Sequence, residues 1–250
     1  MVERPDDRPE HDPRRAELAD RLAVVRKRIA AAAGEAGRSG NLPSLIVVTK
    51  FHPAADIRRL AALGVTDVGE NRDQEAAAKA LELADLKLAW HFVGQLQTKK
   101  ARSVARYAAA VHSVDRPQLV DALAKAVRNE MDSSGRAQLE CFIQVSLDDD
   151  DDGGTHRGGA APADVPLLAE RIAGADGLKL AGVMAVAPLG APPGPAFEKL
   201  AAVSALLVAA HPGAGAISAG MSQDLEAAIK FGATHLRIGS DILGSRPAVG

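Results

Sequence analysis

The feature of this 250-residue sequence that most constrains its fold is a strict alternation of short apolar segments with amphipathic ones. Strands that alternate with helices build a parallel sheet, because the chain must cross back before the next parallel strand begins. Strands are predicted at residues 45–49, 67–69, 88–93, 110–114, 139–147, 180–186, 216–219 and 235–238. The helices that follow are predicted at residues 56–63, 73–84, 98–107, 117–130, 163–173, 196–210 and 223–231.

Eight strand-helix units in a chain of this length predict a single (β/α)₈ barrel, which typically needs about 250 residues. A doubly wound open sheet is the alternative, since the same alternation produces it. The count of eight favours the barrel, and so does the lack of a Gly-x-Gly-x-x-Gly motif after the first strand. Apolar residues at helical spacing predict an extra helix at residues 15–34. Residues 1–13 are charged and proline-rich and are predicted to form a disordered leader before a barrel domain at 14–250.

Composition limits the classes of partner. Thirty Lys and Arg residues against 32 Asp and Glu leave a formal net charge of −2, so we expect no general basic surface for nucleic acid or anionic lipid. The N-terminus has no signal-peptide pattern, and uninterrupted apolar runs are far shorter than the about 18 residues of a spanning helix. We therefore predict a soluble cytoplasmic protein. Cys141 lies in an apolar run and is expected to be a buried hydrophobic residue.

Two other features favour ordinary structural roles. The acidic run Asp148–Gly154 lacks the ligand spacing of a calcium loop, so we expect a solvated loop. The seven histidines form no His-Glu-x-x-His pair, and each is expected to be a surface residue or a satisfied core residue.

The strands predicted here end on polar residues, and active sites of such barrels lie at these C-terminal ends. Strand alternation places Lys50 and Arg237 inside the barrel. The buried Arg237 needs a partner, either a carboxylate such as Glu70 or a ligand atom. A partly desolvated lysine near another cation has a lowered pKa, which suits a nucleophile that forms a Schiff base.

Small residues after the last two strands predict a phosphate-binding cup. It comprises Ser218–Ser222 together with Gly239 and Ser240. Small residues let backbone N–H groups approach an anion, and barrels often bind phosphate in these loops. The structural alternative is that Ser222 caps a helix from Gln223 and that Ser240 caps the next turn. A lysine with a phosphate cup indicates pyridoxal 5′-phosphate (PLP); a phosphorylated-sugar enzyme that uses the same lysine is the other interpretation.

The sequence also resembles the YggS/PROSC family of pyridoxal phosphate homeostasis proteins, whose fold is similar to the barrel domain of alanine racemase. The resemblance covers nearly the whole chain after the leader. Its motifs are VTK (Val48–Lys50), GEN (Gly69–Asn71), WHFVGQLQTKK (Trp90–Lys100), HSVDR (His112–Arg116), GVMAV (Gly182–Val186), SAGMSQDLEAAI (Ser218–Ile229) and RIGSDILGSR (Arg237–Arg246).

The resemblance implies a role for each matching residue. Lys50 would form the internal aldimine with PLP. Ser218, Gly239 and Ser240 would bind its phosphate, with the backbone of Met221 nearby. Arg237 would face the pyridine nitrogen, and Asn71 and Met184 would lie close to the ring. Where the family commonly has Lys-x-Gly, this sequence has Arg157-Gly158-Gly159 after a longer acidic insertion, so the role of that lysine is not transferred.

The residues also bear on whether bound PLP is used for catalysis. A PLP enzyme that uses the ring as an electron sink places a carboxylate on the pyridine nitrogen, and an arginine disfavours the protonated ring. Racemisation needs a second acid-base group opposite the lysine. The one tyrosine, Tyr107, is predicted to point away from that position, and the chain ends shortly after the eighth strand. We therefore expect a monomeric PLP carrier that serves PLP-dependent apo-enzymes, with a monomeric amino-acid racemase and a barrel enzyme without PLP as alternatives.

Overall fold

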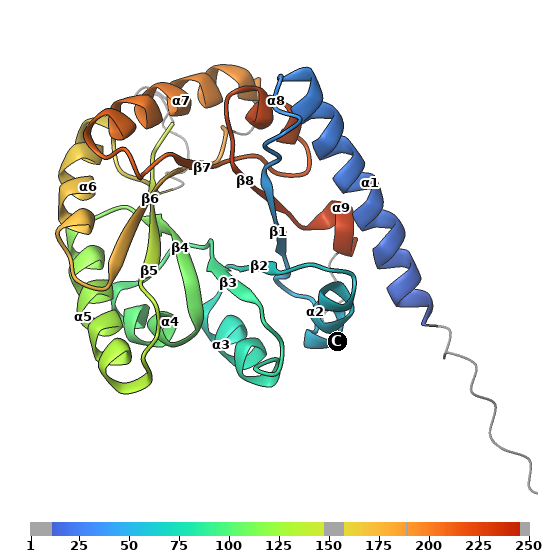
Figure 1. Cartoon of the computed structure of the whole chain (residues 1–250), viewed down its shortest axis with the longest axis horizontal. Coiled ribbons are helices and arrows are strands. Elements are labelled where there is room, and N and C mark those ends of the chain that lie inside the picture. Colours follow the sequence, from blue (N-terminus) through green and yellow to red (C-terminus); the bar gives the residue numbers. More distant parts are fainter. Residues whose placement is uncertain (1–11, 148–157, 189, 246–250) are drawn as a thin grey trace, which may run out of the picture.

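The computed structural model describes residues 12–147, 158–188 and 190–245 and contains a closed parallel barrel in which the strands follow sequence order (Figure 1). The strands are β1 (Ser44–Val48), β2 (Asp67–Glu70), β3 (Ala89–Phe92), β4 (Ala108–Val114), β5 (Leu139–Gln144), β6 (Leu178–Met184), β7 (Ala216–Ser218) and β8 (His235–Ile238). Strand β8 pairs with β1 from Ser44 opposite His235 to Val47 opposite Ile238. This pairing closes the sheet, which confirms the predicted barrel and excludes the open doubly wound sheet.

Helices surround the barrel and form its outer layer (Figure 1). They are α1 (Pro13–Glu35), α2 (Ala54–Ala62), α3 (Asp73–Glu82), α4 (Ala101–Tyr107), α5 (Pro117–Ser134), α6 (Val165–Ala173), α7 (Pro193–Ala210), α8 (Leu225–Lys230) and α9 (Ser240–Leu243). The helices predicted at residues 98–107 and 163–173 each begin with a 3₁₀ turn. These turns are η1 (Thr98–Lys100), before α4, and η2 (Pro162–Asp164), before α6. Strand β5 ends at Gln144, earlier than predicted. The Val145 N–H still donates to Met184 O at 2.8 Å, and Val145 also forms an isolated bridge with Ala160. The acidic run Asp148–Gly154 and Arg157 lie outside the described residues. The two glycines that follow Arg157, Gly158 and Gly159, are described.

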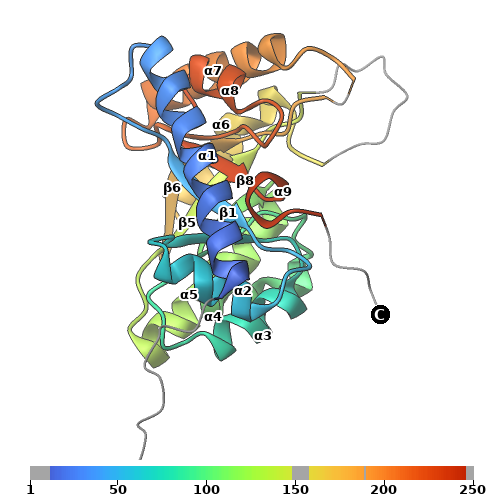
Figure 2. The ribbon, with the colours of Figure 1, turned by 90° about the vertical axis from the view of Figure 1, so that its right-hand side faces the viewer.

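The extra N-terminal helix α1 lies across the β1 and β8 side of the barrel and packs against α2, α8 and α9 (Figure 2). It begins two residues earlier than predicted. Pro13 occupies its first turn, where a missing N–H costs little, and the carboxylate of Asp12 accepts hydrogen bonds from the N–H groups of Arg14 and Arg15. Asp12 and Pro13, predicted to belong to a disordered leader, instead form the start of α1; residues 1–11 lie outside the described part of the chain.

Within the described residues, α7 meets the length and hydropathy that a membrane-crossing helix needs. Glu198 and Lys199 interrupt the apolar segment, so the sequence contains no continuous apolar run of that length there. A single such helix is weak evidence, because helices that pack in a soluble core pass the same test. The side chains of Phe197, Leu200 and Leu207 are buried, as in the other helices of the outer layer.

Two compartments hold the buried side chains. The larger one is apolar and lies between the sheet and the helices. It includes Cys141, whose thiol pKa is raised to about 12 by burial, as expected of a packing residue. Among the described residues, a small apolar cluster in the barrel interior comprises Ala110, Phe142, Ala181 and Met184. Barrel interiors are usually filled by bulky aliphatic residues. Here polar side chains occupy much of the interior, and each of them needs a partner.

Candidate cofactor-binding site

A cavity of about 550 Å³ opens at the C-terminal end of the barrel, where residues from several strand ends and the following loops converge. Six of the eight predicted cofactor contacts line this cavity: Lys50, Asn71, Met221, Arg237, Gly239 and Ser240. The other two, Met184 and Ser218, do not belong to the lining. The predicted site residues therefore gather mostly in one place, at the end of the barrel where ligands bind in this fold.

Lys50 lies two residues beyond the end of β1 and lines the cavity together with Val48, as strand alternation predicts. The next residue, Phe51, has a φ of 68°, in the left-handed region that costs a residue with a side chain about 1 kcal/mol or more. Two contacts hold this turn. The Phe51 N–H donates to Glu75 Oε1 at 2.6 Å, and the Arg72 guanidinium lies 5.0 Å from the centre of the Phe51 ring. The turn that directs Lys50 into the cavity is thus fixed from α3.

A buried ionic network lies behind this turn. Lys79 Nζ donates to Thr49 O at 2.9 Å, to Glu70 Oε1 at 2.7 Å and to Glu75 Oε1 at 2.6 Å. The Thr49 hydroxyl donates to the same Glu70 oxygen at 2.7 Å. Burial raises the pKa of Glu70, and the bonds from Lys79 and Thr49 act in the opposite direction. Of the two partners considered for Arg237, the carboxylate of Glu70 is excluded, because Glu70 lies on the outer face of β2 and bonds to Lys79 on α3.

Arg237 is buried inside the barrel and bonds to two uncharged acceptors. Its Nη1 donates to Ser218 Oγ at 2.6 Å, and its Nη2 donates to Ala185 O at 2.8 Å. Burial lowers the pKa of its guanidinium to about 10, against the attraction of the Asp224 carboxylate. An arginine remains cationic at neutral pH under these conditions. Since Arg237 also lines the cavity, it presents a positive donor to whatever binds there.

The two predicted contacts that miss the cavity lining lie deeper. Ser218 is fully buried on β7, and its hydroxyl lies between Arg237 and His112 Nδ1, at 2.8 Å from the latter. Met184 belongs to the interior apolar cluster. The contact of these residues with a cofactor stays a prediction.

The loops after β7 and β8 differ from the capping alternative. Helix α8 begins at Leu225, and Asp224 occupies its cap position. The Asp224 carboxylate accepts a hydrogen bond from the Met221 N–H at 2.5 Å. Neither serine caps a helix as proposed, because Ser240 is itself the first residue of α9 and Ser222 lies three residues before α8. Instead, their hydroxyl oxygens lie 3.3 Å apart, and both residues line the cavity.

Arg28 on α1 ties the two serine loops together, a role that the sequence did not predict. It donates to Ser222 O at 3.0 Å and to the Asp241 carboxylate at 2.6 Å, and it also bonds to Glu226. The partners are about 200 residues away in the chain, so no local pattern signals these contacts. The extra helix therefore supports the site directly.

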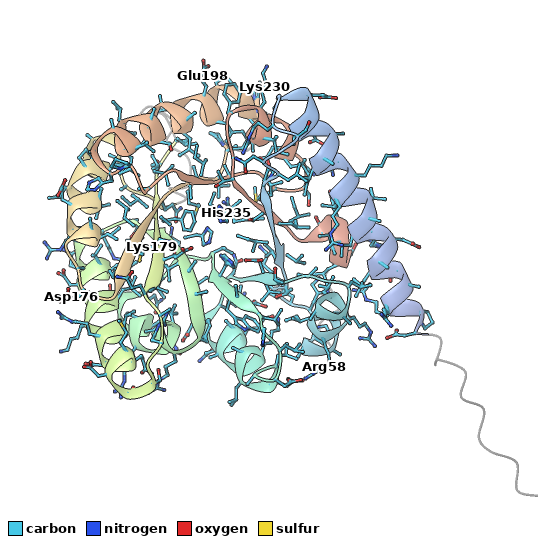
Figure 3. The ribbon with its side chains drawn as sticks, viewed as in Figure 1. Arg58, Asp176, Lys179, Glu198, Lys230 and His235 are labelled. Atoms are coloured by element: carbon cyan, nitrogen blue, oxygen red, sulfur yellow. The ribbon has the colours of Figure 1, made fainter. Side chains whose placement is uncertain are left out.

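Histidines were the second group that sequence reasoning missed. His52 lines the cavity two residues after Lys50, and burial lowers its pKa. His91, His112 and His235 all lie in the barrel interior, where Figure 3 labels His235 on β8. By contrast, the labelled Arg58, Asp176, Glu198 and Lys230 lie on the outer layer (Figure 3). Within the described part of the chain, no three His, Cys, Asp or Glu side chains gather as metal ligands.

The chemistry of the cavity fits PLP. The cofactor has an aldehyde, a phosphate and a pyridine nitrogen, and the lining offers an amine on Lys50, two serine hydroxyls and a guanidinium on Arg237. The first turn of α9 leaves backbone N–H groups without partners inside the helix, which suits an anion. In addition, Asn71 Oδ1 is buried and has no hydrogen-bond partner among the described residues. A buried acceptor of this kind is costly unless a ligand satisfies it.

Known proteins match the sequence and the fold of this chain. Residues 21–247 match the family model described as "Alanine racemase, N-terminal domain". The chain is 46% identical over 225 residues to the pyridoxal phosphate homeostasis protein of Corynebacterium glutamicum, covering 89% of this chain and 99% of the relative. The chain therefore belongs to the alanine racemase N-terminal-domain family, among the pyridoxal phosphate homeostasis proteins.

Solved structures agree with this assignment. PipY of Synechococcus elongatus, determined with PLP bound, is 33% identical and has a TM-score of 0.75, and the match covers 91% of this chain and all of PipY. Alanine racemase of Corynebacterium glutamicum matches with a TM-score of 0.63 at 16% identity, over 94% of this chain and 62% of the racemase. At that identity the racemase shows the shared barrel alone.

Proposed function

We propose that this protein binds PLP covalently through Lys50 and takes part in PLP homeostasis by holding the cofactor and delivering it to other proteins. The observation that carries the proposal is the convergence of Lys50, Arg237 and the Ser222–Ser240 pair on one cavity. The relatives named as pyridoxal phosphate homeostasis proteins support it, as does PipY with PLP bound.

Each part of the cofactor has a partner in this arrangement. Lys50 would hold the cofactor through its amine, which can condense with an aldehyde and release one water molecule. The hydroxyls of Ser222 and Ser240, together with the N–H groups at the start of α9, bind the phosphate. Arg237 directs an N–H donor at the pyridine nitrogen and keeps it unprotonated, since a cation disfavours a second positive charge beside it. Asn71 would lie beside the ring, where its buried Oδ1 could accept a hydrogen bond from the cofactor.

We further propose that the protein does not turn over amino acids. PLP enzymes that withdraw electrons into the ring hold its nitrogen protonated with a carboxylate, whereas this cavity offers Arg237. Racemisation also needs a second acid-base group. The Tyr107 hydroxyl lies 3.5 Å from the Asp73 carboxylate, and Tyr107 is not a lining residue of the cavity. Burial raises the pKa of that phenol, which makes it a poorer proton donor.

The covalent assignment is tested with Lys50→Ala and with the matched control Lys230→Ala, an exposed lysine on the outer layer (Figure 3). Wild type and control should develop the visible absorption band of a lysine-bound PLP, and borohydride reduction should place the adduct on Lys50 by mass spectrometry. Lys50→Ala should lose both. A mutant that keeps the band and carries the adduct on another lysine would overturn the assignment.

The rival function is a monomeric amino-acid racemase, which the alanine racemase-like barrel favours. It predicts exchange of the α-hydrogen of alanine or serine for deuterium at an enzyme-like rate, followed by NMR. We propose that exchange is no faster than with free PLP. The carrier role instead predicts that the loaded protein activates a PLP-dependent apo-enzyme.

We also propose that the protein acts in the cytoplasm as a monomer. Light scattering on the purified chain should give a mass close to 25.9 kDa, and twice that mass would contradict the monomer.

A further inference from the structure

The barrel interior contains a continuous chain of hydrogen bonds that crosses five strands and ends at the cofactor cavity. His91 Nε2 lies 3.0 Å from Asp67 Oδ1, and His91 Nδ1 lies 2.9 Å from His112 Nε2. His112 Nδ1 lies 2.8 Å from Ser218 Oγ, which in turn accepts from Arg237 Nη1 at 2.6 Å. The chain thus runs from β2 through β3, β4 and β7 to β8.

The two ends of this chain determine the direction of its bonds. Arginine can only donate, and an ionised carboxylate can only accept. Hydrogen bonding to His91, together with the Thr66 hydroxyl, lowers the pKa of Asp67 against the effect of burial, so this carboxylate is ionised at neutral pH. Ser218 therefore accepts from Arg237 at one end, and His91 Nε2–H donates to Asp67 at the other.

Full burial lowers the pKa of His112 far below its usual value, so this ring is neutral and carries one hydrogen. If the hydrogen is on Nε2, His112 donates to a neutral His91 and accepts from the Ser218 hydroxyl. Every group in the chain is then satisfied. If the hydrogen is on Nδ1, His112 donates to Ser218 and accepts from His91 through Nε2. His91 must then carry hydrogens on both nitrogens, which makes it a cation, because its Nε2 donates to Asp67. The Ser218 hydroxyl then accepts from both Arg237 and His112, and its own hydrogen needs another acceptor. A buried donor without a partner is costly, which favours the first arrangement.

His112 has little freedom to leave its place. Its ring stacks on Phe142 with centroids 4.2 Å apart and meets His235 edge-on at 6.4 Å. His91 lies at 5.1 Å on another side. A rigid imidazole can therefore hold the Ser218 hydroxyl in one orientation. That orientation determines the position from which the Ser218 oxygen accepts the hydrogen bond of Arg237.

We propose that His91 and His112 are positioning residues, which hold Ser218 and Arg237 in the orientation that meets the pyridine ring of PLP, with both imidazoles protonated on Nε2. The inference rests on the proposed function for its ligand, because Arg237 faces the pyridine nitrogen only if PLP occupies the cavity. It also gives Ser218 a second role, as the acceptor that anchors Arg237.

The first test needs no cofactor. Nitrogen-15 NMR of the histidine rings in the PLP-free full chain distinguishes the two neutral tautomers, and His91→Gln and His112→Gln assign the signals. We expect both rings as the Nε2–H form at neutral pH. A His112 ring protonated on Nδ1 would overturn the proposed direction of the chain.

The second test uses a pair of substitutions that each keep one end of the imidazole. In His112→Asn the amide oxygen replaces Nδ1 as the acceptor for Ser218, whereas in His112→Gln the terminal amide reaches His91 and leaves Ser218 without its acceptor. We expect His112→Gln to weaken PLP binding about tenfold, equivalent to about 1.4 kcal/mol, and His112→Asn to stay within about threefold of wild type. The control is His211→Asn, a histidine at the end of α7 that pairs with Glu170 and takes no part in the hydrogen-bond chain. It should bind PLP within about twofold of wild type.

PLP titration followed by absorbance measures affinity, and thermal unfolding of the PLP-free variants measures stability. Equal PLP affinities of the Asn and Gln variants, or losses that simply follow their unfolding temperatures, would overturn the positioning role. If instead wild type fails to bind PLP while both tautomers are as expected, the proposed function fails and the hydrogen-bond chain stands.

Discussion

Replacing Lys79 with methionine removes the cation that joins two carboxylates and a backbone carbonyl behind Lys50. The substitution keeps a similar length and an apolar stem but removes all three hydrogen bonds, at 2.6–2.9 Å. Glu70, only 1% exposed, then remains as a buried carboxylate bonded to the Thr49 hydroxyl alone. Removing one partner of a buried ion pair typically costs about 3–5 kcal/mol of unfolding free energy, and we expect a loss in that range.

The assay is urea unfolding of the PLP-free wild type, Lys79→Met, Glu70→Gln and the double variant. The double variant should recover at least about 2 kcal/mol relative to Lys79→Met, because no uncompensated buried charge remains. Lys79→Met should also weaken PLP binding, since Thr49 and the Phe51 turn lose their support next to Lys50.

The pH dependence has a definite sign. Burial already raises the pKa of Glu70, and without Lys79 its folded-state pKa rises further above that of the unfolded chain. The unfolding free energy that Lys79→Met loses relative to wild type is therefore smallest below the pKa of about 4.3 that glutamate has in the unfolded chain. This loss grows as the pH rises through the folded-state pKa of Glu70. A loss below about 1 kcal/mol at pH 8, or a deficit that does not change between pH 5 and pH 8, would refute the network.

Two further substitutions probe the cavity wall. Arg28→Ala should weaken PLP binding about three- to tenfold with little effect on the thermal unfolding temperature, because it releases both serine loops, at Ser222 O and Asp241, from α1. The control is Arg26→Ala, because Arg26 bonds to Leu63 and Gly64 just after α2. Equal PLP affinities of the two variants would contradict the role of Arg28. Gly94→Ala should cost at least about 1–3 kcal/mol of stability and disturb PLP binding, since its Cβ would lie 2.2 Å from Asn71 O, and a variant of wild-type stability and affinity would show that this contact relaxes freely.

Much of the fold was predictable because it depends on neighbouring residues. The count of strand-helix units predicted the closed barrel, and most strand boundaries were correct to within two residues. The same local logic placed Lys50 and Arg237 inside the barrel, since alternation along a strand decides which face a side chain takes. The helix boundaries differed from the prediction at α1, where the Asp12 side chain caps an earlier start, and at α8, which starts at Leu225 after Asp224 binds the Met221 N–H.

The partners of the buried charges were not predictable in this way. Arg237 and Glu70 looked complementary in sequence, but they lie on opposite faces of the sheet, and Glu70 bonds to Lys79 while Arg237 bonds to Ser218. Several side chains were chemically able to pair with each, and only their positions in space select among them.

The sequence by itself determined the barrel, its reactive end and the inward lysine and arginine, because these follow from periodicity and from the order of the elements. The tertiary structure alone decided that α1 anchors the serine loops and that histidines from β3 and β4 join Asp67 to Arg237 through Ser218. Such contacts join segments as much as 213 residues apart. They depend on the stagger of the closed strands and on the docking of α1, neither of which is encoded in any single stretch of the chain.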